Sequence, residues 1–419
     1  MSDTRTWFGQ PRGLTILFLT NMWEQFSYYG MRALLVYYMT KQLMLAQGHA
    51  SVVYGAYTAC AYFTPIVGGA VADRYLGKRR AIIIGGSVMA AGHFMMTFEP
   101  LFYVALTTIA LGNGLFLPSL PSQIDDLYEP GDPRIGWAYN VYYVGVNIGG
   151  FLAPLICGTL GEMYGWHWGF GAAGVGMLAG LAIYLWGQRY LPEQARHPRV
   201  ERSVAPQIRF PRETLMLLIA IGLAVTVFRA AYEQVGNTVA LWADRGVDRH
   251  AAGFVIPMTW FQSLNPLLVM TMTPALLVFW RQRAERGQPE RPVRRMAVGA
   301  MVVAGAYLLL AALAAIGGSV HWLWLTLFFV VLTLGELYIL PTGLGLFARL
   351  APTGLRATTV AAWYLATFAG SLAAGFVGTL WGHTGHAAFF LTLAGVALAA
   401  AALLWAIDRT NSTQALETG

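Results

Sequence analysis

Residues 189–212, "RYLPEQARHPRVERSVAPQIRFPR", divide the chain into two halves of similar organisation. This stretch is the longest polar interval of the sequence, and it is rich in arginine and proline. Because proline interrupts helices, we predict a linker here and not a helical spacer. Six apolar segments of membrane-spanning length precede it and six follow it. The sequence therefore predicts two six-helix bundles, at residues 1–188 and 213–419, joined by a linker at residues 189–212.

The composition is typical of a polytopic membrane protein. Hydrophobic residues make up 57% of the 419 residues and charged residues only 11%, whereas soluble domains carry about 25% charged residues. A water-soluble protein of this size would lack the charges to cover its surface. We therefore predict an all-α integral membrane protein that resides in the lipid bilayer. The twelve spans are expected near residues 13–40, 50–72, 80–98, 101–124, 136–160, 167–188, 213–243, 250–280, 296–317, 321–348, 357–382 and 386–407.

The basic residues gather in alternate loops, chiefly at residues 73–80, 189–212 and 281–295. When every basic residue is assigned to a side of the membrane, roughly 22 of the 27 Lys and Arg residues lie on one side and about three on the other. By the positive-inside rule, we expect a multi-pass protein of a bacterial inner membrane with both termini in the cytoplasm. The formal net charge of +7 then reflects topology, and no nucleic-acid partner is implied.

Five charged residues lie well inside the predicted spans, away from their ends: Glu24, Arg32, Arg229, Glu233 and Glu336. Each would cost about 2.5–3.5 kcal/mol or more if it faced lipid at mid-depth. Together they would cost more than about 10 kcal/mol, which is comparable with the stability of a whole protein. They must therefore pair or line a water-filled cavity. We interpret them as proton-coupling or gating residues, and structural ion pairs between helices are the alternative.

Three of these residues are carboxylates that could carry a proton. A glutamate in a partly apolar cavity can take up a proton when a nearby arginine moves away, so Glu24, Glu233 and Glu336 are the candidates. His93 is the one histidine inside a predicted span. Because no acidic residue lies near it in the sequence, we interpret His93 as a packing residue.

Polar and aromatic side chains occur on the same helices as these charges. Many of them lie near the middle of a span, where Tyr and Trp cannot act as interfacial anchors. A cavity with aromatic walls and a few carboxylates suits a small zwitterionic or amide-bearing solute better than a lipid or a bare ion. The candidate substrate-binding residues are Gln25, Tyr28, Tyr29, Tyr62, Tyr143, Asn147, Asn265, Glu336 and Trp363.

Several longer motifs follow one another from about residue 20 to residue 380. They are "WEQFSYYGMRALL" (23–35), "GAYTACAYFTPIVGGAVADRYLG" (55–77), "NVYYVGVNIGGFLAP" (140–154), "WFQSLNP" (260–266) and "GELYILPTGL" (335–344). In this order they closely resemble the proton-dependent oligopeptide transporter family of the major facilitator superfamily. The resemblance implies the major facilitator superfamily fold, with twelve transmembrane helices in two six-helix bundles. It also implies alternating access around a central di- or tripeptide site, with protons as co-substrate, no cofactor and a monomeric functional unit.

The resemblance also implies roles for individual residues. Arg32 and Glu233 match a pair that closes the extracellular side, and Glu24 matches the second glutamate of the first-helix coupling motif. The residues that match the site of the peptide's amino end are Asn147, Asn265 and Glu336, and those that match pocket walls are Tyr28, Tyr62 and Trp363.

The chain departs from the family pattern at two basic positions and one acidic position. The family's first-helix motif is Glu-x-x-Glu-Arg, whereas residues 21–25 here are Asn-Met-Trp-Glu-Gln, and Leu117 replaces a fourth-helix lysine. The missing bases are those expected to meet the peptide carboxylate and to close the cytoplasmic gate against Glu336. Arg229, one helical turn before Glu233, is the candidate for compensation.

The sequence thus predicts a proton-coupled symporter that imports di- and tripeptides. Because bases are missing, a transporter of a modified or non-peptide solute, or a peptide facilitator without tight proton coupling, remains an alternative. An enzyme is not expected, since the sequence has no Gly-x-Ser-x-Gly or His-Glu-x-x-His motif and no Asp in the apolar segments. A receptor that binds without translocating would be expected to carry a signalling domain.

Overall fold

The computed structural model describes residues 6–7, 9–129, 131–192, 210–287, 291–352 and 355–417. Within these residues, twelve helices contain 18 or more residues. Nine helical spans of the described residues are both long and apolar enough to cross a membrane. The other three long helices are α1 (Arg12–Tyr37), α2 (Gln47–Val71) and α3 (Lys78–Met95). Of these, α1 contains buried polar residues, and α3 begins with three consecutive basic residues. The prediction of an all-α protein with twelve long helices is confirmed.

The helices follow the chain in an order that matches the predicted spans, with short helices between some of them. The first half contains α1 (Arg12–Tyr37), α2 (Gln47–Val71), α3 (Lys78–Met95), α4 (Phe102–Ser119), α5 (Ser122–Asp125), α6 (Ile135–Ala153), α7 (Thr159–Tyr164) and α8 (Trp166–Gly187). The second half contains α9 (Arg212–Tyr232), α10 (Thr238–Arg245), α11 (Leu264–Glu285), α12 (Pro292–Ile316), α13 (Trp322–Leu350), α14 (Arg356–Gly378) and α15 (His386–Glu417).

Strands are short and occur only at helix ends and loops of the described residues. Each of the six strands has two residues, and they form three two-stranded pairs. The pairs are β1 (Thr6–Trp7) antiparallel to β2 (Gln10–Pro11), β3 (Val247–Asp248) parallel to β6 (Val320–His321), and β4 (His250–Ala251) antiparallel to β5 (Phe254–Val255).

The seventh and eighth predicted spans differ from the observed helices by residues that are not helical. The eighth was expected from about residue 250, but helical structure begins only at Met258, because Ala252 and Gly253 have positive φ angles of 48° and 82° and form the turn between β4 and β5. The seventh is broken after α9 by a 3₁₀ turn, Glu233–Gly236, and Asn237 has non-helical dihedral angles. The break places Glu233 directly after the last residue of α9.

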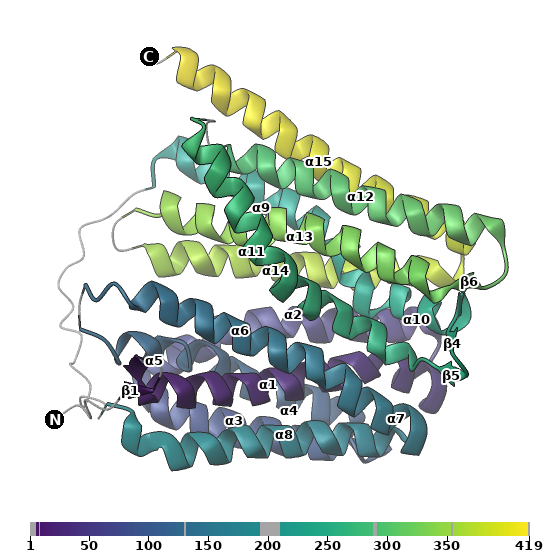
Figure 1. Cartoon of the computed structure of the whole chain (residues 1–419), viewed down its shortest axis with the longest axis horizontal. Coiled ribbons are helices and arrows are strands. Elements are labelled where there is room, and N and C mark those ends of the chain that lie inside the picture. The colour runs from purple at the N-terminus through teal and green to yellow at the C-terminus, as the bar shows by residue number, and fades with distance from the viewer. Residues whose placement is uncertain are drawn as a thin grey trace. The chain divides into compact units, whose positions relative to one another are not determined.

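Contacts group the chain into two units. The first contains Met1–Leu43 and Cys60–Val204, and the second contains Met44–Ala59 and Ala205–Gly419. The beginning of α2 therefore belongs with the second unit. Residues 193–209 of the predicted linker lie outside the described residues, so the division into bundles at residues 189–212 stays a prediction. Figure 1 shows the long helices of each unit lying side by side.

In the first unit, α1 packs against both α6 and α8. Small residues permit this close approach: a Cβ atom added to Gly176 of α8 would lie only 2.5 Å from Cδ1 of Phe26. A Cβ atom added to Gly180, one turn further along α8, would lie 3.0 Å from Cβ of Trp23. Glycine pairs of this spacing let helix backbones approach closely in membranes. α8 therefore packs closely against the aromatic side chains of α1.

In the second unit, α12 packs against both α13 and α15. The hydroxyl of Tyr307, a fully buried side chain of α12, donates a hydrogen bond of 2.6 Å to the carbonyl oxygen of Ala231. Ala231 lies in the last turn of α9, where the helix carbonyls lack partners within the helix. This bond fixes the end of α9 and, with it, the position of Glu233.

The beginning of α2 is attached to the second unit by small and polar residues. Ser51 donates a hydrogen bond of 3.0 Å to Asn237, and Gln47 donates one of 2.9 Å to the carbonyl oxygen of Gly378. A Cβ atom added to Gly375 of α14 would lie 3.1 Å from the Cα atom of Gly55. Backbone-to-backbone packing and hydrogen bonds thus hold this half of α2 in place.

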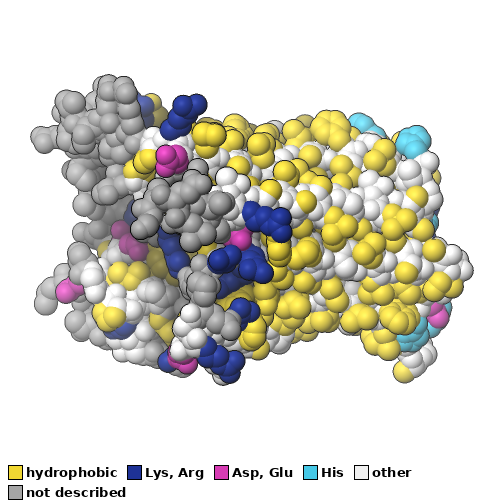
Figure 2. Space-filling view, turned by 90° about the horizontal axis from the view of Figure 1, so that it is seen from above, with side chains coloured by type: hydrophobic (Ala, Val, Ile, Leu, Met, Phe, Trp, Pro, Cys, Tyr) yellow, Lys and Arg dark blue, Asp and Glu magenta, His cyan; other side chains and the backbone are white. Residues whose placement is uncertain are grey.

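The surface carries the pattern expected for contact with lipid. On the face shown in Figure 2, Lys and Arg side chains gather at one end of the helices, and hydrophobic side chains cover much of their length. On α9, the exposed residues Leu215, Ile219 and Leu223 follow one another at intervals of four residues, so they form one apolar face. Such a stripe is stable in a bilayer and would be unfavourable in water.

A substitution in α8 tests the packing of α1. Gly176→Val is expected to destabilise the protein by about 1–3 kcal/mol, because the new side chain would overlap Phe26. Gly171→Val is the matched control in the same helix, since no atom lies within 4 Å of the position of its Cβ. The melting temperatures of both variants in detergent provide the measurement. Equal melting temperatures would contradict close packing at Gly176.

Candidate functional site

Arg229 and Glu233 form a buried ion pair at the end of α9. Both side chains are almost completely buried, and Nη2 of Arg229 donates a hydrogen bond to Oε1 of Glu233. Their separation of four residues places them on one face of the helix. Ser371 of α14 donates a second hydrogen bond to the same carboxylate oxygen, at 3.4 Å. Arg229 therefore faces the interior of its unit, a point that the sequence left open.

Glycine at position 370 makes room for this pair. A Cβ atom added to Gly370 would lie 3.3 Å from Cγ of Arg229 and even closer to its Cβ atom. The guanidinium carbon of Arg229 also lies 5.3 Å from the centre of the Tyr232 ring, within the range of a cation–π interaction. The guanidinium is thus held by a carboxylate and by an aromatic ring.

Asn265 and Glu336 meet in a second polar cluster of the same unit. Nδ2 of Asn265, in the first turn of α11, donates a hydrogen bond of 2.5 Å to Oε2 of Glu336 and one of 3.1 Å to the hydroxyl of Thr333. Thr333 and Glu336 lie three residues apart on α13, so they occupy one face. The structure therefore brings together two of the predicted substrate-binding residues.

Glu24 and Gln25 form the polar cluster of the first unit. Both lie on α1, and Glu24 is only 1% exposed. Nε2 of Gln25 donates a hydrogen bond of 2.7 Å to Oε2 of Glu24. The other carboxylate oxygen, Oε1, is buried and has no hydrogen-bond partner among the described residues. One turn before Gln25, Asn21 donates a hydrogen bond of 3.1 Å to the carbonyl oxygen of Tyr142 on α6.

The remaining predicted residues occupy varied environments. Asn147 of α6 is buried and donates a hydrogen bond of 3.0 Å to the carbonyl oxygen of Tyr143, whose own side chain is half exposed. Trp363 is buried in the core of the second unit, with its ring centre 5.3 Å from that of Phe347. The partly buried residues are Tyr28 and Tyr29, whose ring centres lie 5.3 Å apart, Arg32 and Tyr62. The pairing of Arg32 with Glu233 stays a prediction.

Sequence reasoning missed a set of uncharged polar residues beside Glu233. The amide oxygen of Gln234 accepts hydrogen bonds from Asn237 at 3.3 Å and from Thr238 at 2.9 Å, and its nitrogen donates to the carbonyl oxygen of Ala374 at 2.7 Å. The signal was present in the sequence, because amide and hydroxyl residues cluster within an otherwise apolar span. Among the described residues, no group of three or more His, Cys, Asp or Glu side chains could hold a metal ion.

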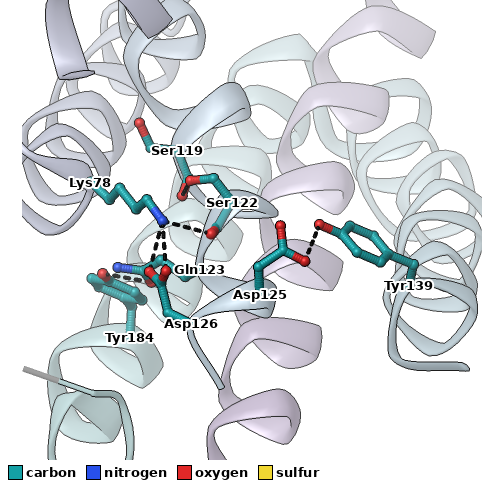
Figure 3. A network of polar contacts seen from close by, with 8 residues as sticks. All are labelled: Lys78, Ser119, Ser122, Gln123, Asp125, Asp126, Tyr139 and Tyr184. Atoms are coloured by element: carbon teal, nitrogen blue, oxygen red, sulfur yellow. Dashed lines mark hydrogen bonds and ion pairs between the residues drawn. The ribbon is translucent and has the colours of Figure 1, made fainter. Parts of the chain in front are cut away.

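A further polar network joins the ends of several helices in the first unit. Nζ of Lys78, the first residue of α3, donates hydrogen bonds to both carboxylate oxygens of Asp126, at 2.9 and 2.8 Å (Figure 3). Next to it, Tyr139 of α6 donates to Asp125, and Tyr184 of α8 donates to Gln123, each at 3.1 Å. The network ties α3, α5, α6 and α8 together at one end of the unit.

The loop that follows this network contains a local ion pair. Arg134 donates side-chain and backbone hydrogen bonds to Asp132. These bonds, together with the positive charge of Arg134, hold the pKa of Asp132 below its usual range. Asp132 therefore keeps its negative charge at neutral pH.

Removal of one partner tests the buried pair. Arg229→Met is expected to destabilise the protein by about 3–5 kcal/mol, because it leaves a buried carboxylate without its cation. The matched control is Arg281→Met on α11, which breaks another pair with the same spacing, Arg281–Glu285, whose side chains are largely exposed and contribute little. Thermal unfolding in detergent measures both. If Arg229→Met unfolds at the same temperature as the control, the pair does not stabilise the fold.

Known proteins are similar to this chain in amino-acid sequence along most of its length. A family model described as PTR2, POT family, matches residues 79–212 and 211–391. A di-/tripeptide transporter of Lactococcus lactis subsp. cremoris is 32% identical, over 86% of this chain and 88% of that protein. The peptide transporter YePEPT of Yersinia enterocolitica subsp. palearctica is 30% identical, over 89% of this chain and 88% of that protein.

A solved structure extends the similarity to three dimensions. The crystal structure of a peptide transporter POT in complex with sulfate matches this chain with a TM-score of 0.89 and 30% identity, over 97% of this chain and 96% of that one. The match confirms the predicted major facilitator superfamily fold. POT proteins are membrane transporters and not enzymes, in agreement with the prediction from the motifs. The chain belongs to the POT family, the family that its sequence motifs indicate.

Proposed function

We propose that this protein is a proton-coupled symporter that imports di- and tripeptides by alternating access. The observation that supports this proposal most directly is the presence of three carboxylates, Glu24, Glu233 and Glu336, within long helical segments of a POT-family chain. Relatives of similar length are named as a di-/tripeptide transporter and, in Proteus mirabilis, as dipeptide and tripeptide permease A. The di- and tripeptides in these names belong to the class of small zwitterionic or amide-bearing solutes that the polar and aromatic residues of the spans suit.

The surroundings of the three carboxylates support proton coupling. Glu233 is paired with a cation, whereas the donors that the structure gives Glu24 and Glu336 include the neutral amides of Gln25 and Asn265. A buried carboxylate without a cation is stabilised when it binds a proton, because burial of an uncompensated charge is costly. Glu24 is therefore suited to gain and lose a proton during transport. Glu336, which interacts with the charges of both Arg229 and Glu233, and Glu233 itself are the other proposed coupling residues.

The two ends of a bound peptide would meet different chemistry. Glu336, with Asn265 and Asn147, supplies the negative charge and amide groups that suit a peptide's amino end. The carboxylate end lacks the two bases of the family pattern, since Gln25 and Leu117 occupy their positions. In this proposal, the Gln25 amide and tyrosine hydroxyls hold the carboxylate by neutral hydrogen bonds. The other proposed substrate contacts are Tyr28, Tyr29, Tyr62, Tyr143 and Trp363.

We also propose how the chain is oriented in the membrane and that it functions as a monomer. The chain is a multi-pass membrane protein. We propose that it resides in a bacterial inner membrane with both termini on the cytoplasmic side. The distribution of basic residues supports this orientation. The proposed partners are a small peptide and protons, and the proposed functional unit is a monomer with bundles at residues 1–188 and 213–419.

Uptake by reconstituted protein tests the coupling. In liposomes, labelled dialanine is expected to accumulate with an inward proton gradient and only to equilibrate without one. Glu24→Gln keeps the size and hydrogen bonding of the side chain but cannot release a proton, so it is expected to abolish gradient-driven accumulation while counterflow exchange continues. Glu285→Gln, at the exposed end of α11, is the control. Equal wild-type uptake under both conditions would instead identify a facilitator.

Peptides with free and amidated C-termini test the substrate. A bound peptide stabilises the protein by mass action, so free dipeptides are expected to raise the melting temperature more than amidated ones. Gln25→Arg restores the basic residue of the family pattern, which can form a charge-assisted hydrogen bond with the peptide carboxylate. Such a bond contributes about 1.5–3 kcal/mol, so the affinity for free peptides is expected to rise about tenfold or more. Stronger binding of amidated peptides by the wild type would favour a modified or non-peptide solute.

A further inference from the structure

An open groove lies on the second unit where α15 packs against α12. The two helices lie side by side (Figure 1), and the groove has a volume of about 600 Å³. This volume is within the range of about 300–1,000 Å³ that is usual for small-molecule sites. The residues that line the groove include Met301 of α12 and, on α15, Leu398, Ala402, Trp405, Ala406 and Arg409. The groove is therefore apolar along most of its length and basic at one end.

Small side chains leave room for the groove on α15. Leu398, Ala402, Trp405 and Arg409 follow one another at intervals of four, three and four residues, so they lie on one face of the helix. Ala402 and Ala406 are exposed, and their methyl groups leave space beside the larger side chains. This part of α15 belongs to a span that is long and apolar enough to cross a membrane. The groove therefore opens towards lipid hydrocarbon and not towards water.

The length of the groove matches one leaflet of a bilayer. Arg409 lies eleven residues after Leu398, which corresponds to about 16 Å along the helix axis. The hydrocarbon core of a bilayer is about 30 Å thick, so one leaflet contributes about half of that thickness. On α12, Arg294 and Met301 lie seven residues apart, again on one face of the helix. An acyl chain that begins beside Arg409 would therefore end near Leu398 and Met301.

Arginine side chains surround the polar end of the groove. The guanidinium carbon of Arg294 lies 5.2 Å from the centre of the Trp405 ring, within the range of a cation–π interaction. Both Arg294 and Arg409 are exposed. Residues 291–316 and 386–410 contain four arginines but a single acidic residue, Asp408, which lies 3.9 Å from Arg291. This end of the groove therefore carries a net positive charge.

The chemistry of the two parts of the groove indicates its occupant. Guanidinium groups bind phosphate oxygens in a bidentate geometry, and tryptophan is typical of the boundary between lipid hydrocarbon and water. Basic pockets between membrane helices bind the headgroups of anionic lipids. In the proposed orientation, this end of the groove lies at the cytoplasmic leaflet, whose surface is negatively charged. The groove thus offers apolar contacts for an acyl chain and two cations for a phosphate group.

We propose that the groove between α12 and α15 binds an anionic phospholipid. One acyl chain lies along Ala402 and Ala406, and the headgroup phosphate lies against Arg294 and Arg409. The site uses none of the residues proposed to bind peptide or protons. Because the lipid contacts two helices of the folded second unit, its binding stabilises the protein by mass action.

Lipid binding to the purified protein tests the charged end of the site. Native mass spectrometry measures the affinity of the first bound lipid for phosphatidylglycerol and for phosphatidylcholine with the same acyl chains, and we expect phosphatidylglycerol to bind more tightly. Arg294→Gln and Arg409→Gln are each expected to weaken its binding about fivefold, the contribution typical of one basic residue at an anionic membrane surface. Arg283→Gln removes an exposed arginine of α11, outside the groove, and is the matched control.

A substitution that fills the groove tests its apolar part. Ala402→Phe leaves the charge unchanged and is expected to abolish tight binding of the first phosphatidylglycerol. Ala388→Phe, at an exposed alanine near the start of α15, is the matched control and is expected to bind like the wild type. Equal affinity for the two lipids, or an equal loss in Arg283→Gln, would overturn the proposal. Wild-type binding by Ala402→Phe, or displacement of the lipid by glycerol phosphate alone, would identify a surface phosphate site and overturn it as well.

Discussion

The cost of charge inside a membrane determines how this protein is built. A charged side chain at mid-depth must find a partner within the protein, because lipid offers none. In the described residues, some of these partners are local, whereas Glu336 bonds to Asn265, 71 residues away. Arg229 and Glu233 pair within one helix turn, and Gln25 bonds to its neighbour Glu24. Neighbouring residues hold the Arg229–Glu233 pair in position. Tyr307 fixes the end of α9, and Gly370 leaves room for Arg229.

The helical architecture could be predicted from the sequence, because it depends on composition and on the length of apolar runs. The start of the eighth span could not, since it is set by the positive φ angles of two loop residues, Ala252 and Gly253. The break of the seventh span at Asn237 was missed for a related reason: its side chain bonds to Ser51 of α2, and a single sequence does not reveal which distant helices are neighbours.

The polar site was predictable in part. Asn265 and Glu336 were proposed together from the family motifs, and the structure joins them by a hydrogen bond. The pairing of Arg229 with Glu233 follows from their spacing of one helical turn, which brings side chains together, whereas a compensating role for Arg229 stays a prediction. The interpretation of His93 as a packing residue agrees with its complete burial on α3; the sequence could not reveal the group that it contacts. Its partner, Ser27, is 66 residues away.

Local pairing changes how the proposed transport cycle can be coupled. In the family pattern, Glu233 is expected to pair with Arg32, so opening of the gate would separate the two charges and favour protonation of the carboxylate. In this chain, Arg229 lies in the last turn of α9, directly before Glu233, and forms a buried ion pair with it. Glu233 can therefore keep its counter-ion in every state, and its proton binding is less dependent on the gate. Glu24 has an amide neighbour and a buried oxygen that no described residue satisfies. The proton-sensitive step is accordingly expected to depend more on Glu24 than on Glu233.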